Sequence, residues 1–591
     1  MIVPMKKVVL LMQPKDAGSA LESLRSLGLL HIEHQQLSRS QETGAIQDEI
    51  QVVDKAIKVL LEQQCLTADK VTGRHDINWK NTAGHIVDLD MRINNLKEDS
   101  LDLRNQISQC EPWGDFDPLA VADLSKKQVY LGFYQVPTGE IKNLPGNLIV
   151  KKISGSAGMV NYIIIASRKP DLPFKELSLP KMGLNKLRQR LEEDIEVISS
   201  LKEEITKYVP YRHTLIEAKK FLENELEFQR TLRGMGKDGE ITYVTGYIPF
   251  DAVAQIEKVS RFQQWGIIVR DPAQEDIVPT LIRNPRWVSI VDPIFKMIEI
   301  IPGYRELDMS LWFLLFFSIF FGMLIGDAGY GATFLMLTFM AQKKWSRKLT
   351  DKSVFILFYI LSSSAIIWGL LTATFFGQEW LPTYFRPLMP ALKNDKNLQA
   401  FCFFLGATHL SIAHLWRFIT KLPSVIALAD AGWISVLWGG FFLARTLVLG
   451  DFFPAAAKWF FIAGPILVVF FSSPRKNVFQ GIGIGLGNLL LNIVNSFTDV
   501  VSYIRLFAVG LATVAVADSF NAMGMSIGYS NLLRGAMASL ILILGHALNL
   551  ALGPMSILVH GIRLNVLEFS NHLDIKWSGF AYNPLKWHKL S

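Results

Sequence analysis

The sequence has 591 residues, half of them hydrophobic and 38 of them phenylalanine, and its mean hydropathy is +0.25. This length exceeds that of one domain, and this hydropathy excludes a wholly soluble protein, so part of the chain must lie in a membrane. The net charge of +7 is better explained by anionic lipid headgroups than by nucleic acid, because the basic residues cluster in short loops that flank apolar segments.

The three cysteines, Cys65, Cys110 and Cys402, are scattered and show no CxxC spacing. This pattern argues against a disulfide framework and against a zinc site, and it favours reduced, structural thiols. The first apolar run spans about six residues, which is shorter than the ~7–15 residues of a signal-peptide core. We therefore expect the N-terminal half to stay in the cytosol, with the composition changing near Asp308.

The N-terminal half, residues 1–300, is predicted to begin with a small α/β lobe over 1–37 and 236–300. Strands are expected at 8–12, 29–32, 241–249 and 267–269, with helices at 17–27, closed by Gly28, and at 250–262. A second lobe is expected over 111–182, with strands at 128–135, 148–153 and 162–166.

Two helical arms, 38–110 and 183–235, are predicted between these lobes because apolar residues recur at spacings of three and four. The seams break only at Ser100, Asp194 and Pro210, and their members are Ile86, Leu89, Ile93, Leu96, Leu103, Ile107, Leu184, Leu187, Leu191, Ile198, Leu201, Ile205, Tyr208, Leu215, Leu222 and Leu226. The fold predicted for this half is a cytosolic dumbbell of two α/β lobes joined by an antiparallel coiled coil. Such a rod usually serves as a strut, with a plain dimerisation coil as the alternative.

No GxxxxGK[ST] loop occurs, so no Walker-type nucleotide site is expected. The run Gly481, Gly483, Gly485 and Gly487 follows no predicted strand, and close helix packing explains it better than a dinucleotide site. His409 and His414 lack a third metal ligand nearby. We expect no metal and no cofactor.

The C-terminal half, residues 301–591, is predicted to be a polytopic helical membrane domain, so the whole chain is mostly α. Spans of the ~17–25 residues that cross hydrocarbon are expected at 309–326, 328–342, 354–377, 399–417, 430–449, 457–473, 484–520 and 532–568, which is about eight. Both termini then lie on the inside, and the loops obey the positive-inside rule. The last two segments exceed one span and should be strongly tilted.

Arg505 lies near the middle of the apolar stretch 488–520, where a lone guanidinium costs about 2.5–3.5 kcal/mol on insertion scales. Steps of four and three place a polar series on one face of the helix that leads to it: Asn488, Asn492, Asn495, Asp499 and Ser502. The stretch 546–568 repeats the pattern with His546, Asn549, Gly553, Ser556, His560 and Arg563. These faces either hold the bundle together by hydrogen bonds or serve ion transport.

Arginine keeps its charge when buried because its pKa exceeds ~12. A carboxylic acid within ~4–6 Å of it would have its pKa lowered by ~1–3 units and would release its proton. This chemistry suits an ion translocator whose moving carboxylate belongs to another subunit.

The chain resembles the membrane subunit of V/A-type rotary ATPases, which is called subunit I in bacteria and archaea and subunit a in eukaryotes. The resemblance covers nearly the whole chain. It rests on MKKVVLLM, LGLLHIE, YVTGYIP, IRNPRWV, PGYRELD, GMLIGDAGYG, SYIRLFAVGLA around Arg505 and HALNLALGPMSILVHGIRLNVLEF around Arg563.

The resemblance implies a non-catalytic stator, for protons or sodium. The composition and the short soluble half suggest a prokaryote and therefore an inner membrane. Arg505 would face the carboxylates of a proteolipid (c/K-type) ring between two aqueous half-channels, with Arg563 as the supporting arginine. The candidates for half-channel lining are Asn488, Asn492, Asn495, Asp499, Ser502, His546, Asn549, His560 and Glu568. The implied partners are the ring, E/G-type peripheral stalks, a d/C-type central-stalk socket subunit, the soluble ATPase head through the stalks, and membrane lipid.

Glu568 matches the acid of the family motif RLxxxE, but on an α-helix it would lie about 140° around the axis from Arg563, at ~100° per residue. Some relatives carry acids where this chain has Leu491 and Gly553. Asp327 could sit at a channel mouth or cap a helix. The alternative functions are a self-contained secondary transporter with a cytosolic docking rod and a membrane tether whose arginines are structural.

Overall fold

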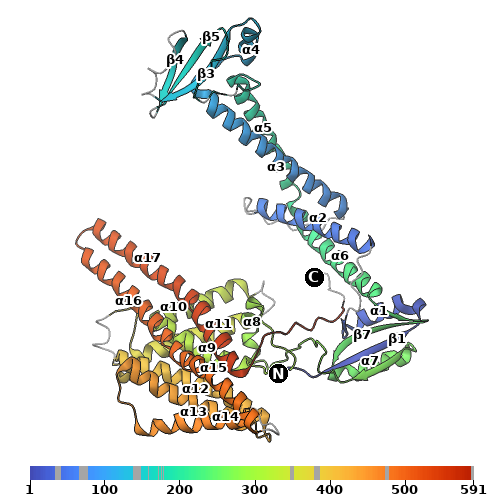
Figure 1. Cartoon of the computed structure of the whole chain (residues 1–591), viewed down its shortest axis with the longest axis vertical. Coiled ribbons are helices and arrows are strands. Elements are labelled where there is room, and N and C mark those ends of the chain that lie inside the picture. The colour runs from blue at the N-terminus through green and yellow to red at the C-terminus, as the bar shows by residue number, and fades with distance from the viewer. Residues whose placement is uncertain are drawn as a thin grey trace. The chain divides into compact units, whose positions relative to one another are not determined.

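The computed structural model describes residues 1–33, 41–64, 78–137, 148–156, 159–170, 172–174, 176–177, 179–346, 352–378, 386–472 and 478–586 (Figure 1). Within these ranges the chain is mostly helical. It divides into two compact units, of which one comprises 1–9, 29–31 and 246–584 and the other 10–28, 32–245 and 585–591. Cys65 and the loop cations at 347, 348, 475 and 476 fall outside the described residues.

The strands and helices predicted at the two ends of the N-terminal half are present. They are β1 (Met5–Met12), α1 (Ala17–Leu27), β2 (His31–Glu33), β7 (Ile241–Pro249), α7 (Val253–Phe262) and β8 (Gly266–Arg270). The sheet has the order β2-β7-β1-β8, and β6 (Gly236–Asp238) pairs with β7. Gly28 ends α1 with φ +63°, a left-handed conformation that glycine adopts without a steric penalty.

In the part of the arms that the structure describes, four helices are present: α2 (Gln41–Gln64), α3 (Trp79–Cys110), α5 (Leu184–Thr206) and α6 (Arg212–Arg233). Helix α2 packs on α6, and α3 packs on α5 (Figure 1). Of the predicted seam, Ile86, Leu89, Ile93, Leu201, Ile205, Leu215 and Leu222 are buried in one core with Val53 and Leu60. Lys219 donates to Asp54 at 2.6 Å, and this hydrogen bond lowers the pKa of Asp54 to about 2.

The segment between the arms forms an antiparallel sheet of β3 (Tyr130–Pro137), β4 (Ile149–Ser156) and β5 (Met159–Ala166), in the order β3-β5-β4. Phe133 pairs with Ile163, and Lys151 also pairs with Ile163 from the other side. Helix α4 (Pro118–Lys126) packs against β3. The sheet buries Tyr134, Val136 and Ile164 on one face.

The C-terminal half is a helical bundle with a phenylalanine-rich core. Its helices are α8 (Asp292–Ile298), α9 (Ser310–Ile325), α10 (Ala328–Trp345), α11 (Ser353–Thr372), α12 (Asp395–Lys421), α13 (Ala427–Leu449), α14 (Lys458–Phe471), α15 (Val478–Ser502), α16 (Ile504–Ile527), α17 (Leu532–Ser556) and α18 (Ser570–Leu573). Figure 1 shows the long helices α16 and α17 side by side, and they are in contact.

The predicted count of eight spans is not confirmed. Among the described residues, five helices are long and apolar enough to cross a membrane, or six if a bent pair is one span. The bent pair is α9 and α10, whose directions differ by a bend of 120°, and α14 has only 14 residues. The last two apolar segments are long, as predicted, at 46 and 42 residues.

Asp327 sits at the bend between α9 and α10, where the structure makes it a helix cap. Its side chain is wholly buried and accepts hydrogen bonds from the backbone N–H groups of Gly329, Tyr330 and Gly377, at 2.7, 3.1 and 3.1 Å. The preceding Gly326 has φ +67°, which allows the sharp turn. One carboxylate therefore holds the start of α10 and the segment after α11 together.

Replacing Asp327 with alanine should destabilise the bundle, because each buried donor left without an acceptor costs about 1–3 kcal/mol. Asp327→Asn should have a smaller effect, because its one carbonyl oxygen can still accept from the start of α10. We expect melting temperatures in detergent to fall in the order wild type, Asp327→Asn, Asp327→Ala. Asp451→Asn, at a half-exposed ion pair with Arg445, is the control and should melt with the wild type.

Candidate functional site

Arg505 lies in the first turn of α16, immediately after an interruption of the long apolar segment. Helix α15 ends at Ser502 and α16 begins at Ile504, so Tyr503 separates the two helices. The Tyr503 ring is fully buried, and its hydroxyl lies 2.7 Å from Nδ1 of His409. The helix break is thus anchored in the core of the bundle, and it fixes where the Arg505 side chain begins.

The guanidinium of Arg505 is paired with a carboxylate of its own chain. Its Nη2 donates to Oε1 of Glu568 at 2.5 Å, and its Nε donates to the carbonyl of Ser502 at 3.0 Å. The Glu568 side chain is 5% exposed, whereas that of Arg505 is 23% exposed. The Glu568 carboxylate therefore partly balances the positive charge of Arg505, while part of the Arg505 side chain stays exposed.

Glu568 also contacts the second arginine, since Nε of Arg563 lies 3.5 Å from the same Oε1. The predicted separation of about 140° between Arg563 and Glu568 is wrong, because the segment is not α-helical. Residues Ile557–Gly561 (η10) and Leu564–Phe569 (η11) form π-helix. Hydrogen bonds from i to i+5 bring residues five apart to nearly the same face, and Glu568 therefore reaches both arginines.

A polar cavity of about 800 Å³, here called the Asp499 cavity, lies along α15 before Arg505. Of the predicted lining residues it includes Asn488, Asn492, Asn495 and Asp499. Ser502 is not part of its wall and donates instead to the carbonyl of Asp499 at 2.7 Å. The rest of the wall includes His414, Arg417, Lys421, Asp430, Trp433, Ser472, Ser496, Thr498, Asn571, His572 and Asp574.

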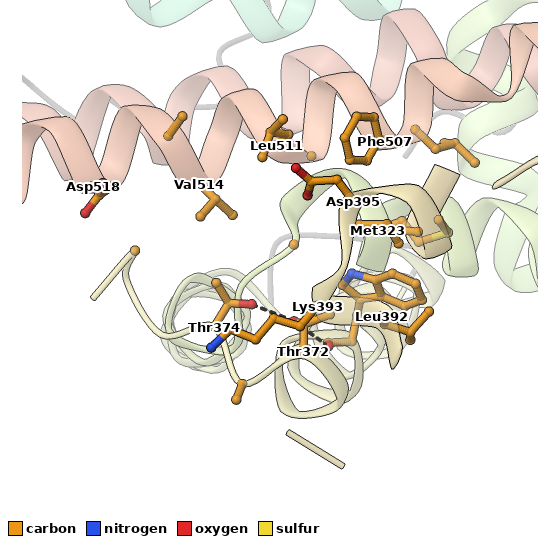
Figure 2. A pocket seen from close by; sticks show the side chains of 18 of the residues that line it. Met323, Thr372, Thr374, Leu392, Lys393, Asp395, Phe507, Leu511, Val514 and Asp518 are labelled. Atoms are coloured by element: carbon orange, nitrogen blue, oxygen red, sulfur yellow. Dashed lines mark hydrogen bonds between the residues drawn. The ribbon is translucent and has the colours of Figure 1, made fainter. Parts of the chain in front are cut away.

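A second cavity of about 590 Å³, here called the Asp518 cavity, lies along α16 after Arg505. Figure 2 shows Phe507, Leu511, Val514 and Asp518 along one helix, facing Asp395 and the threonine pair Thr372 and Thr374 across the space. The two threonine hydroxyls are 2.5 Å apart. The two cavities thus follow consecutive helices, one on each side of Arg505 in the sequence.

His546 and Asn549, which were predicted to line a half-channel, lie in another cluster. His546 contacts the Tyr330 hydroxyl at 2.7 Å and Oδ1 of Asn521 at 3.2 Å. Asn549 is buried and donates to the carbonyl of Thr513 at 2.9 Å. His560 lies in η10, half-buried, three residues before Arg563.

Several titratable or charged residues were not predicted to line a cavity: Asp395, His414, Arg417, Lys421, Asp430, Asp518 and His572. One signal was available for Asp430 and Asp518. Each is a single carboxylate inside an apolar helix, which by itself indicates a functional or paired position. His572 follows the last predicted span, and only the three-dimensional fold brings it to the cavity.

These features define a polytopic membrane protein that holds charged side chains inside its helical bundle. Known proteins similar to this chain include "V-type ATP synthase subunit I" of Borreliella burgdorferi, 30% identical with 99% of each chain covered. "V-type ATP synthase subunit I 1" of Treponema pallidum is 31% identical over 99% of this chain and all of that one. "A-type ATP synthase subunit I" of Methanocaldococcus jannaschii is 24% identical over 84% of this chain and 80% of that one.

The chain therefore belongs to the family of subunit I of V-type and A-type ATP synthases, as the sequence resemblance predicted. No protein-family model matches it. The solved cytoplasmic N-terminal domain of a subunit I, described as a homologue of subunit a of V-ATPase, is 13% identical and covers 45% of this chain and all of that one. Its TM-score of 0.21 carries no argument about the fold.

Replacing Glu568 with glutamine should destabilise the bundle, because it leaves the partly buried Arg505 without its counter-charge. The double variant Arg505→Ala/Glu568→Gln should lose less stability than the two single variants lose together, by a coupling energy of about 0.5–3 kcal/mol. Thermal unfolding of the purified protein measures both effects. Glu299→Gln, at an exposed carboxylate, is the matched control, and additive effects of the two single variants would contradict the ion pair.

Proposed function

We propose that this chain is the ion-translocating stator subunit of a rotary ATPase or ATP synthase. The observation that carries the proposal is Arg505 itself, whose side chain is 23% exposed and which follows the Asp499 cavity and precedes the Asp518 cavity along two consecutive helices. A ring carboxylate that passed this permanent cation would be held ionised. It would take up its ion from one cavity and release it to the other.

Glu568 fits this role as the group that positions the arginine. Its single oxygen Oε1 contacts both Arg505 and Arg563, so one negative charge faces two positive charges. The cluster keeps a net positive charge, which favours the approach of a further carboxylate. A fully neutralised Arg505 would attract a passing carboxylate much less strongly.

The positive-inside rule predicts the side of the membrane to which each cavity opens. The Asp499 cavity includes Arg417 and Lys421, at the predicted inner end of the span 399–417, and Asp574 near the C-terminus. The Asp518 cavity includes Lys393, which belongs to a predicted outside loop. The first cavity would be the cytosolic half-channel and the second the opposite one.

The N-terminal half would act as the strut of the stator. Its two paired arms, with a separate sheet between α3 and α5 in the sequence, support the dumbbell of two lobes and a coiled coil. We propose that it binds the peripheral stalks and reaches the soluble head through them. The chain itself would be non-catalytic and would act with the proteolipid ring and the central-stalk socket subunit in a prokaryotic inner membrane.

One observation favours the tether function, in which both arginines only stabilise the bundle. Arg505 is bonded to a buried carboxylate of the same chain, as a purely structural arginine would be. The exposed part of its side chain and the cavities along the helices before and after it support transport instead. The two functions differ in how they respond to lysine at this position, because lysine keeps the positive charge in an ion pair but can lose its proton when buried.

The test is ATP-driven ion uptake by membrane vesicles that contain the assembled complex. Arg505→Ala and Arg505→Lys should both reduce uptake to background, whereas Arg563→Ala should reduce it in part. Each variant must co-purify with the proteolipid ring in normal amounts. Uptake that survives in Arg505→Ala would refute the stator mechanism, and a silent Arg505→Lys would support the tether. Absence of any co-purifying proteolipid would favour a secondary transporter.

A further inference from the structure

The π-helical segment η11 leaves one buried backbone carbonyl without its α-helical partner. In an α-helix the carbonyl of Val566 would accept from the N–H group of Ser570, but that N–H donates to the carbonyl of Leu567. Two side chains donate to the Val566 carbonyl instead. They are the hydroxyl of Ser570 and Nε1 of Trp577, the latter at 3.3 Å.

The register of this segment decides what Glu568 can reach. In the π-helical register its Oε1 lies 2.5 Å from Arg505 and 3.5 Å from Arg563. In an α-helical register Glu568 would turn to about 140° from Arg563 and would no longer face the two arginines. That register would return the Ser570 N–H to the Val566 carbonyl, so it competes with the π-helical one. Side chains that donate to this carbonyl therefore favour the pairing of Glu568.

Trp577 is held in place by its own backbone and by packing. Its φ angle is +54°, a left-handed conformation that a bulky residue keeps only where its surroundings impose it. Its half-buried ring packs against the core of the bundle, to which the buried Ile575 belongs. Two residues later the N–H of Gly579 donates to the carbonyl of Ile301 at 3.2 Å. These constraints direct the indole N–H toward η11.

The same tryptophan belongs to a C-terminal strap, defined here as residues 575–583, that also contacts the N-terminal sheet. The carbonyl of Thr280 accepts from the N–H of Tyr582 at 3.0 Å. The Tyr582 ring packs against a core that contains Met5 of β1 and Tyr247 of β7. These residues and the bundle belong to one compact unit. The strap therefore connects this edge of the sheet to the carbonyl in η11.

We propose that Trp577 is a positioning residue of the arginine site, which holds η11 in the π-helical register together with Ser570 and through which the C-terminal strap controls the pairing of Glu568. The inference rests on the proposed function and adds a means of regulation to it. While the strap is seated, Glu568 partly balances Arg505 and Arg563. When the strap is displaced, η11 returns to α-helix and both arginines lose this carboxylate. The position of the N-terminal sheet thereby affects the charge that faces a ring carboxylate.

The first test measures the coupling between Arg505 and Glu568 from melting temperatures of Arg505→Ala, Glu568→Gln and their combination, in three backgrounds. These are the wild type, Trp577→Phe, which keeps an aromatic ring and removes the N–H donor, and Trp577→Phe/Ser570→Ala, which removes both donors. The non-additivity should shrink in the second background and vanish in the third. Trp459→Phe, at a 70% exposed tryptophan of α14, is the matched control and should keep it in full. A merely structural Trp577 would lower every melting temperature and leave the non-additivity unchanged, and that result would overturn the proposal.

Gly579→Ala tests the strap and leaves the indole in place. A Cβ atom at Gly579 would lie 2.0 Å from the carbonyl oxygen of Pro302, so the strap must shift there. The non-additivity should therefore shrink in this background too. It should stay complete in Gly84→Ala, at a glycine of α3 whose added Cβ would meet nothing within 4 Å. Full non-additivity in Gly579→Ala would refute the control by the strap.

ATP-driven ion uptake by vesicles that contain the whole complex separates this inference from the proposed function. Uptake should fall by up to about tenfold in Trp577→Phe, the effect of one hydrogen bond on an equilibrium, and further in Trp577→Phe/Ser570→Ala, with Trp459→Phe unchanged. If the non-additivity persists in every background while Arg505→Ala abolishes uptake, the positioning role fails and the stator function stands. If Arg505→Ala keeps its uptake, the stator function fails, whereas lost non-additivity would still support the role of Trp577 in the register. Normal uptake by Trp577→Phe/Ser570→Ala after its non-additivity is lost would overturn the regulation.

Discussion

The ion pair between Arg505 and Glu568 is the interaction on which the membrane half depends. A guanidinium in an apolar helix costs several kcal/mol unless it is paired or hydrated. Glu568 supplies the pairing from a distant helix, with Nη2 and Oε1 2.5 Å apart, while nearly a quarter of the arginine side chain stays exposed. The pair thus keeps a fixed positive charge inside the bundle and leaves part of it exposed. Only an exposed positive charge of this kind can act on a group from outside the bundle.

The positions of the charged groups are set by breaks, bends and π-helical turns of the backbone, and not by regular α-helix. The break at Tyr503 sets the start of α16, and the π-helical turns after Ile557 bring Arg563 and Glu568 to one face. The chain bends by 120° between α9 and α10 at Asp327, and the carboxylate there satisfies three buried N–H groups. Each departure costs hydrogen bonds of an ideal helix, and packing or a buried side chain compensates for it.

The two cavities divide the polar residues into separate sets. The asparagines of α15 and Asp499 share the first with a buried pair of histidines and with Asp430, while Asp518 and Asp395 share the second with two threonines. His546 and Asn549 bond to Tyr330, Asn521 and Thr513. Chemically similar residues therefore lie in different sites, and only their contacts in the structure assign each residue to its site.

The sequence by itself determined the parts of this protein that follow from periodicity and composition. These are the helices and strands of the N-terminal half, the change to an apolar C-terminal half, the polar face of α15, the two arginines within long apolar segments and the family. Each depends on residues close together in the chain, where spacing decides which face a side chain occupies. The tertiary structure alone decided that Glu568 bonds to both arginines, that α9 and α10 are a bent pair, and that His572 meets His414 and Asp499. Those contacts join residues up to 158 positions apart, and a helix can reach them only after the bundle has packed and its backbone has departed from the α-helical repeat.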